Sequence, residues 1–498
     1  MYKKNVNCKD KYIDLSFYFV YINLQLQKKI YKNKFKYQLK EVYNMKKIRL
    51  ILAMLLLSFT VSCSSGAAPA ETENPDGTEE PKVAVDYNGD EFIILNNKPD
   101  VLGYKEDTVL ADAVLERIEQ VEASANCIIT LDSRTDVPTY VPSAFASGTD
   151  CGDIFYVDAA DFRNLANSDY LTDIMQYSDI VDYKDSFRWG SKSTLELITC
   201  KGTLFGVTPA SWIDHLSPYY FVLVANDSIF IDNGYSAPSE YYEKKEWNLE
   251  LFEDVVKNCY DEQRGIYGLE SGYDFIARMA LYSNGFRLVD ENGENGFYSD
   301  NATEALNWAS EFMKNNKAAI ASTAETSENF LKNSAALCTT DVIRLCQKIA
   351  FSDVASFTVL PFPSGKSVEK GTLGGFLSTN MCSIGIPVSN ERVDESAYLI
   401  NEIFAPMNGI NSLEDLKAYY TSNLFFHPSD IEVIFDLAEA AEYNYWVESA
   451  WDSIAGITGG IANKSATELI EMYAPKLDTY LADYVIPNKQ GLENYFID

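Results

Sequence analysis

Histidine is almost absent from this chain, which has 2 histidines among 498 residues. Two histidines are too few for a metal site made of several histidines and leave few candidates for a catalytic triad that uses one. We expect no metal and no cofactor. The sequence also contains no P-loop and no glycine-rich dinucleotide motif with its acidic residue. Nothing in it indicates nucleotide chemistry.

Basic residues are scarce as well, since 41 Lys and Arg stand against 73 Asp and Glu and give a net charge of −32. Residues 1–62 hold 13 of the basic residues and 3 of the acidic ones, so the chain after residue 62 has a net charge of −42. Such a surface repels phosphate backbones and anionic lipid head groups. The sequence therefore predicts neither a nucleic-acid partner nor electrostatic docking to a membrane.

Cysteine pairs with the spacing of a metal knuckle are missing too. The nine cysteines include no CxxC motif, and Cys338 and Cys346 lie too far apart for such a site. Cys8 and Cys63 belong to the N-terminal segments, which leaves an odd number in the body of the chain. We expect buried free thiols, and an isolated disulfide is the open alternative.

A signal peptide begins at Met45, where MKKIRLILAMLLLSFTVSC has a basic start, a short apolar core and small residues before Cys63. We expect residues 45–62 to be this signal. The codons of Lys40-Glu41-Val42 can form a ribosome-binding sequence upstream of the Met45 codon. We therefore expect residues 1–44 to be untranslated upstream sequence, with an unusual N-terminal extension as the alternative.

The segment Thr60-Val61-Ser62-Cys63 resembles a bacterial lipobox, although the usual Leu is replaced by Thr60. The resemblance implies that a lipid such as palmitate is attached at Cys63 and that the protein is anchored at the extracellular face of the cell membrane. Residues 63–84 are rich in Pro, Glu, Ala and Gly and contain no aromatic side chain. They form a flexible tether in this interpretation.

The remaining chain is longer than one hydrophobic core usually organises, so two or more domains are expected. Apolar runs at Glu91–Leu95, Cys127–Leu131 and Asp153–Val157 read as buried strands that alternate with helical patterns. This alternation predicts a parallel sheet, whose ligands lie beyond the carboxyl ends of the strands. Asp158 and Asp161 follow the third strand directly; ligand contact and helix N-capping are both open for them.

A crossover follows between two short strands, Leu204–Val207 and Tyr220–Ala225. Two prolines and several polar residues separate the strands and prevent a continuous ladder. The loop is therefore expected to expose Trp212 and Tyr219 where two structural units meet. We interpret Trp212 as a binding platform, while a core position is the alternative.

Three stretches resemble the extracellular solute-binding proteins (family 1 type) of bacterial ABC importers. They are LFGVTP with the later YYF and NDSIF, then ASGTDCGDIFYVDAADFRNLANSDYLTDI, and NLELFEDVVKNC. The resemblance implies an α/β, two-lobed periplasmic-binding-protein-like (type II) fold with hinge crossovers and a ligand cleft between the lobes. Lobe 1 would comprise residues 85–208 and 335–404, and lobe 2 residues 209–334 and 405–498. The crossovers are expected near Thr208–Tyr219 and Asn333–Leu345.

The same resemblance implies a binding protein and not an enzyme. It would be a lipoprotein and a monomer that delivers a sugar or oligosaccharide to ABC transporter permease subunits, with the lipid as its only membrane contact. Aromatic rings beside acidic hydrogen-bond acceptors suit a sugar, but they also suit a cationic solute or a peptide. A surface glycoside hydrolase is a further alternative, which needs two carboxylates at one site.

The expected ligand-binding residues combine these aromatic and acidic side chains with a pair of glycines. Gly374 and Gly375 permit positive φ and close approach of the backbone to a ligand, although a tight turn would need them equally. Isolated tryptophans in the C-terminal helices are more often core than ligand platform. The full set is Asp158, Asp161, Trp212, Tyr219, Tyr273, Gly374, Gly375, Trp446 and Trp451.

Overall fold

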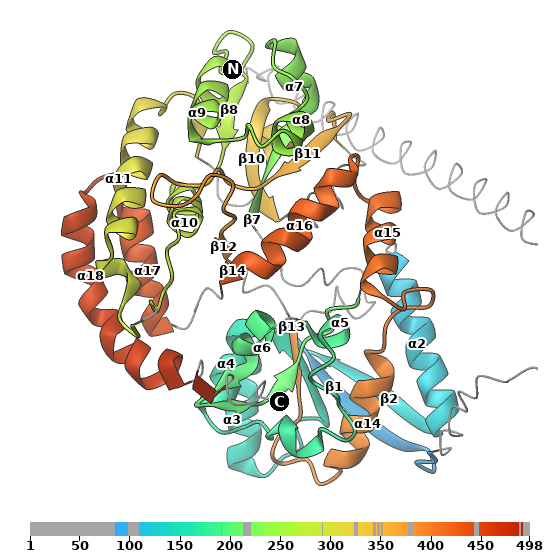
Figure 1. Ribbon diagram of the computed structural model, residues 1–498. Coiled ribbons are helices and arrows are strands. Elements are labelled where there is room, and N and C mark those ends of the chain that lie inside the picture. Colours follow the sequence, from blue (N-terminus) through green and yellow to red (C-terminus); the bar gives the residue numbers. More distant parts are fainter. Residues whose placement is uncertain are drawn as a thin grey trace, which may run out of the picture. The chain divides into compact units, whose positions relative to one another are not determined.

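The computed structural model describes most of the chain after residue 84 (Figure 1). The described ranges are 85–97, 109–190, 192–212, 221–290, 292–322, 327–341, 345, 349, 352–376, 382–442, 448–487 and 490–491. The predictions on the upstream sequence, the signal peptide, Cys63 and the tether lie outside these residues.

The first of the two five-stranded sheets contains the predicted parallel strands. Its strand order is β2-β1-β3-β13-β6, in which β1 pairs in parallel with β2 and β3, and β13 runs antiparallel to β3 and β6. The strands are β1 (Asp90–Asn96), β2 (Cys127–Ser133), β3 (Ile154–Asp158), β6 (Gly206–Val207) and β13 (Cys382–Gly385). The three strands expected from their apolar runs are thus confirmed.

Helices α2 (Val109–Ala125) and α4 (Ala159–Asn167) contact this sheet, α3 (Val137–Ser147) lies against α4, and α14 (Val393–Ile403) against α2. Short helices and strands occupy the chain between α4 and β6. These are η1 (Ile174–Tyr177), α5 (Ser186–Trp189), α6 (Lys192–Ile198), β4 (Thr199–Cys200) and β5 (Thr203–Leu204).

The second sheet has the order β11-β7-β10-β8-β9, with β7 antiparallel to both of its neighbours and β8 parallel to β10 and β9. Its strands consist largely of buried apolar residues, so both faces of the sheet are covered. The strands are β7 (Phe221–Asn226), β8 (Tyr267–Glu270), β9 (Ile320–Ala321), β10 (Ala335–Asp341) and β11 (Phe357–Leu360).

One predicted boundary is wrong. The return to the first lobe was expected at residue 335, but β10 pairs with β7 and β8, and β11 pairs with β7. Strands β10 and β11 therefore belong to the second sheet. The chain re-enters the first sheet only at β13, so the second crossover lies between β11 and β13 and not near Asn333–Leu345.

The second group of elements comprises the second sheet and the helices named below, and two of these helices begin at capping side chains. Asn248 accepts a hydrogen bond from the Leu251 amide at the start of α9, and Ser299 accepts one from the Ala302 amide at the start of α11. The N-cap of α11 is therefore Ser299. The helices are α7 (Asp227–Asp232), α8 (Pro238–Glu243), α9 (Leu249–Asn258), α10 (Tyr273–Ser283), η2 (Gly296–Tyr298), α11 (Asp300–Asn315), α12 (Glu328–Leu331), α15 (Leu413–Asn423), α16 (Pro428–Ala440), α17 (Glu448–Gly460), α18 (Ala466–Tyr480) and η3 (Leu481–Val485).

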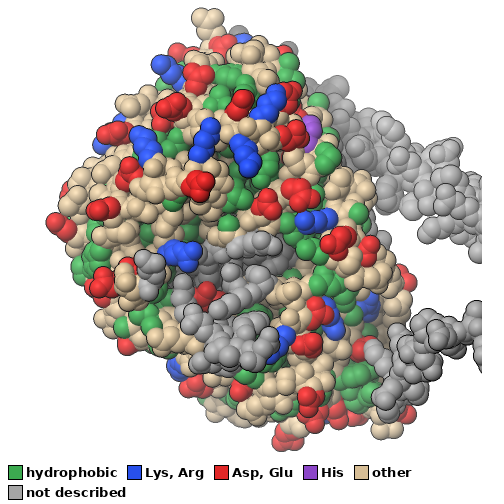
Figure 2. Space-filling view, in the orientation of Figure 1, with side chains coloured by type: hydrophobic (Ala, Val, Ile, Leu, Met, Phe, Trp, Pro, Cys, Tyr) green, Lys and Arg blue, Asp and Glu red, His purple; other side chains and the backbone are tan. Residues whose placement is uncertain are grey.

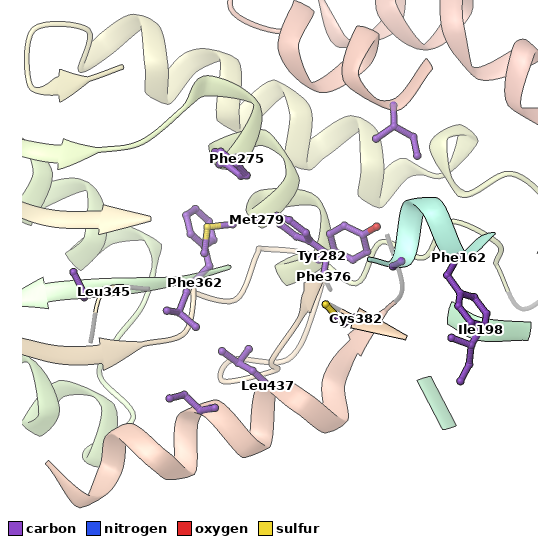
Figure 3. Packing of buried hydrophobic residues seen from close by; sticks show 14 of the residues in the cluster. Phe162, Ile198, Phe275, Met279, Tyr282, Leu345, Phe362, Phe376, Cys382 and Leu437 are labelled. Atoms are coloured by element: carbon purple, nitrogen blue, oxygen red, sulfur yellow. The ribbon is translucent and has the colours of Figure 1, made fainter. Parts of the chain in front are cut away.

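Helix α10 is buried along nearly its whole length because both α11 and α17 pack against it. Figure 3 shows Met279 and Tyr282 of this helix beside Phe376, which lies in the short strand β12 (Gly375–Phe376). The Tyr282 and Phe376 rings have their centroids 5.5 Å apart. Strand β12 pairs in parallel with β14 (Ala441–Glu442).

The passages that connect the two groups of elements include, in chain order, one from β6 to β7, one from β11 to β13, and one from α14, which lies beside α2, to α16, which lies beside β11. The third passage is held by Arg117 of α2. Its guanidinium donates to the carbonyl oxygens of Glu402, Ala405 and Pro406 at 3.3, 3.1 and 2.8 Å. A charged donor thus fixes the backbone where the chain leaves α14.

The surface and the cysteines agree with the composition. On the face drawn in Figure 2, acidic side chains are spread over the surface and are not gathered in one patch. Six described cysteines are buried and free: Cys127, Cys151, Cys200, Cys259, Cys338 and Cys382. Within the part of the chain that the structure describes, no helix has the length and apolarity needed to cross a membrane.

Candidate functional site

Polar side chains follow the three parallel strands of the first sheet at the edge where these strands end. Asn97, Arg134 and Asp158 come at the carboxyl ends of β1, β2 and β3. The strands end side by side, because the Arg134 amide donates to the Asn96 carbonyl at 2.8 Å and the Asp158 amide donates to Asn97 Oδ1 at 3.0 Å. We call Asn97, Arg134, Asp158 and Asp161 the polar edge.

Asn97 joins the two aspartates that the sequence singled out. Its Nδ2 donates to Asp158 Oδ2 at 3.1 Å and to Asp161 Oδ2 at 2.7 Å. Asp158 is also the N-cap of α4, since its Oδ1 accepts a hydrogen bond from the Asp161 amide at 2.9 Å. The capping role is confirmed for Asp158, while ligand contact by either aspartate stays a prediction. Both side chains are half-buried.

Sequence reasoning did not select Asn97. The rule that selected Asp158, a polar residue directly after a buried parallel strand, applies equally to Asn97 after β1. It would have found this residue.

An aromatic ring and a cation lie at the end of β2. The Arg134 guanidinium carbon is 3.7 Å from the centroid of the Tyr140 ring, and Arg134 Nε donates to Asp132 Oδ2 at 2.7 Å. The polar edge therefore offers carboxylate acceptors, the guanidinium donors of Arg134 and a nearby ring. This combination binds hydroxyl groups and apolar faces by hydrogen bonding and contact. Within the described residues, no cluster of metal-ligating side chains occurs.

In the second group, the predicted residue Tyr273 begins α10, just after β8 ends. Its side chain is half-buried. The next residue, Asp274, accepts a hydrogen bond from Arg278 at 3.0 Å, and the Arg278 side chain is 1% exposed. Burial lowers the pKa of Arg278, and the charge of Asp274 opposes that shift. The start of α10 thus presents Tyr273 beside an ion pair of which the arginine is buried and the aspartate half-buried, and ligand contact by Tyr273 stays a prediction.

The paired glycines have a packing role. A Cβ on Gly374 would lie 2.0 Å from the Tyr282 carbonyl oxygen, so only glycine lets this segment approach the end of α10. Gly375 belongs to β12 and pairs with Ala441. Neither glycine is among the described residues with positive φ, so the expectation of a left-handed turn is wrong here.

Trp212 is a core residue, and the expected exposed platform is wrong. Its side chain is 0% exposed, its ring centroid lies 5.0 Å from that of Phe404, and its indole Nε1 donates to the Ala405 carbonyl at 3.1 Å. The sequence around Trp212 shows no apolar period because its partners come from a passage almost two hundred residues later. The ring therefore joins the first and third passages between the sheets.

The side chains of the three remaining predicted site residues lie outside the described part of the chain. Tyr219 and Trp446 lie outside the described residues. Trp451 lies on α17, whose backbone is described at that position, but its side chain is outside the described set.

Two searches found nothing: no family model matches the chain, and no curated protein matches it. Solved structures do match. The ABC substrate-binding protein Lmo0181 from Listeria monocytogenes, in complex with cycloalternan, is similar at a TM-score of 0.56 and 14% identity, over 79% of this chain and 99% of that one. An ABC transporter solute-binding protein from Thermotoga lettingae, bound with α-D-tagatose, is similar at a TM-score of 0.54 and 14% identity, over 79% and 100%.

These likenesses show the fold. The chain has the mixed α/β, two-lobed architecture of periplasmic-binding-protein-like proteins, as the sequence predicted. Each sheet with its helices forms the centre of one lobe. In such open α/β sheets, ligands bind beyond the carboxyl ends of the strands, which in the first lobe is the polar edge.

Proposed function

We propose that this protein is the extracellular solute-binding component of an ABC importer and that its solute is a sugar or an oligosaccharide. The observation that carries the proposal is the polar edge, where Asn97 joins the carboxylates of Asp158 and Asp161 and Arg134 lies at the end of a neighbouring parallel strand. Groups of this kind pair with the hydroxyls of a sugar. The two similar structures, whose ligands are cycloalternan and tagatose, support the same solute class.

The proposal has further parts. The protein acts by binding and not by catalysis, hands its solute to permease subunits, and is held at the outer face of the membrane by a lipid on Cys63. The support for the lipid is the lipobox resemblance of Thr60-Val61-Ser62-Cys63. Both similar structures are named as binding proteins, which supports the non-enzymatic role.

A thermal-shift screen with the purified protein tests the solute class. Monosaccharides, linear and cyclic oligosaccharides, amino acids, short peptides and organic cations are compared. A ligand that binds the native state raises the melting temperature, and about 100 times its dissociation constant stabilises by about 2.7 kcal/mol. Stabilisation by a sugar, with the sugar recovered intact, supports the proposal. Stabilisation by peptides or cations alone, or release of hydrolysed sugar, would replace it with one of the alternatives.

Replacing Asp161 with alanine is expected to weaken binding of the sugar found in that screen by roughly tenfold, because a charged hydrogen bond contributes about 1.5–3 kcal/mol and part of it is regained from water. Asp161 is the cleaner probe of the two aspartates, since Asp158 also caps α4. Calorimetric titration measures the affinity, and a thermal melt without ligand should change little.

Asp179→Ala is the matched control for this measurement. Asp179 is an exposed aspartate of the same lobe that lies outside the polar edge. Its removal changes the net charge equally and should leave the affinity unchanged. Equal losses in both variants would mean that overall charge, and not the polar edge, governs binding.

Cys63→Ala is expected to move the protein from the membrane fraction to the medium, because one lipidated residue is the proposed anchor. Mass spectrometry of the native protein should find the modified residue at the mature N-terminus and no peptide from residues 1–44. Retention of the Cys63→Ala protein in the membrane fraction would refute the anchor. A peptide from residues 12–37 would refute the start at Met45.

A further inference from the structure

A cavity of about 410 Å³ lies among the helices of the second group, away from the elements of the polar edge. Its volume is in the range of small-molecule sites. Side chains of α10 and α11 line it, together with the start of α9 and the segment after β11. The lining residues used below are three acidic ones, one lysine, one tryptophan and two apolar ones: Asp300, Glu304, Glu311, Lys366, Trp308, Ala305 and Phe362.

Three of these residues form one stripe on α11. Glu304, Trp308 and Glu311 are separated by four and then three residues, so they lie on the same face of the helix. Seven residues of helix place the two glutamates about 10 Å apart along the axis. The indole therefore lies between two carboxylates inside one cavity.

Neighbouring side chains hold this stripe in position. Glu304 Oε2 accepts hydrogen bonds from Asn284 Nδ2 at 3.2 Å and from the Ser367 hydroxyl. Trp308 donates its indole N–H to Glu253 at 2.7 Å and stacks on Phe312 with centroids 5.0 Å apart. The orientation of the carboxylate and of the ring is thus fixed before any ligand arrives, which lowers the entropic cost of binding.

The charge of the cavity selects for cations. Three carboxylates, those of Asp300, Glu304 and Glu311, line it with one ammonium group, that of Lys366. Two buried apolar residues, Ala305 and Phe362, form the floor of the cavity; they are 4% and 2% exposed. A positively charged group beside an indole gains cation–π attraction, and methylene groups can lie on the apolar floor. A neutral sugar would leave the excess negative charge uncompensated.

We propose that this cavity is a second binding site, which takes a linear aliphatic polyamine. One ammonium group pairs with Glu304 and another with Glu311, and the methylene chain between them lies along Trp308. The site is formed by elements of the second group alone, so the proposal does not depend on the nature of the solute bound at the polar edge.

Calorimetric titration of the purified protein with spermidine, at about 0.15 M salt to screen diffuse attraction, tests the site. We expect saturable binding at one site, and binding of butylamine, which has one ammonium group, at least fivefold weaker. Glu311→Gln should weaken spermidine binding roughly fivefold. Glu311 is exposed, so this variant should melt like the wild type. Glu304→Gln and Trp308→Leu should weaken binding as well.

Glu294→Gln is the control, because Glu294 is an exposed carboxylate outside the cavity. It should bind spermidine as the wild type does. Equal weakening in Glu294→Gln and Glu311→Gln, or equal binding of butylamine and spermidine, would show only diffuse attraction to an acidic protein and overturn the proposal. Competition between spermidine and a sugar that stabilises the protein would place the amine at the sugar site and overturn it too. An absence of sugar binding would affect only the proposed function.

Discussion

Trp212→Ala is expected to lower the free energy of unfolding by about 3–5 kcal/mol, as truncation of a fully buried tryptophan does. The ring is 0% exposed and lies against Phe404, and its N–H is donated to the Ala405 carbonyl. Alanine would leave a cavity at this contact and would remove one of the two donors to the Ala405 carbonyl, which also accepts from Arg117 at 3.1 Å. Urea unfolding at neutral pH, with the midpoint and slope fitted together, measures the loss.

Two further variants separate the loss of the hydrogen bond from the loss of apolar contact and compare it with an exposed ring. Trp212→Phe keeps most of the apolar contact but removes the donor, so about 1–2 kcal/mol should be lost. Phe426→Ala, at a ring that is 47% exposed, should cost much less than Trp212→Ala. A Trp212→Ala protein that unfolds like the wild type but binds its sugar weakly would contradict the core position and restore the binding platform.

Asp430→Asn is expected to change how stability depends on pH. Burial raises the pKa of Asp430 to about 6, although the amides of Val359 and His427 donate to its oxygens at 2.7 and 3.0 Å and lower it. The charge of Asp227, which His427 Nε2 contacts at 2.9 Å, raises it further. The carboxyl group thus holds its proton more tightly in the folded chain than in the unfolded one.

The direction of the effect follows from proton linkage. A raised folded pKa means that the stabilisation from protonated Asp430 is complete below its unfolded pKa of about 3.9 and is lost as pH rises through about 6. The stability of the wild type relative to Asp430→Asn should therefore fall between about pH 4 and pH 7, by on the order of 2–3 kcal/mol.

Urea unfolding of both proteins across this pH range measures the difference. The asparagine can accept through only one oxygen, so it adds a constant offset, and the change with pH is the quantity of interest. Asp179→Asn, at an exposed site, should follow the wild type. The same comparison in a His427→Gln background separates the carboxyl group from the neighbouring imidazole. A difference that rises with pH, or stays flat, would contradict the raised pKa.

Much of the fold could be predicted because local patterns dictate it. The apolar runs that became β1 and β3 are largely buried, and the stretch from Asn248 that resembles a family helix forms α9. The sheet to which β10 belongs could not be predicted in the same way. A short apolar strand pairs equally well with either sheet, and the partner is set by tertiary contacts of β7 and β8.

The candidate site was predicted less completely. Asp158 was found by its position after a buried strand, but the identical position of Asn97 after β1 was passed over. The prediction for Trp212 was wrong for a physical reason. Prolines and polar neighbours predict an exposed loop, but Phe404 and Ala405, which are distant in the sequence, cover the ring. Similarly, Gly374 is required by the Tyr282 carbonyl, which no local pattern reveals.

The hydrogen bond between Trp212 and Ala405 also limits which motions the connections between the sheets allow. A single extended passage can twist about its own bonds, but two passages fastened side by side lose most of that torsional freedom and keep the freedom to bend. Arg117 adds to the effect by fixing the carbonyls on both sides of the same point. We therefore expect this contact to restrict rotation between the lobes more than bending, so that opening and closing would follow one direction.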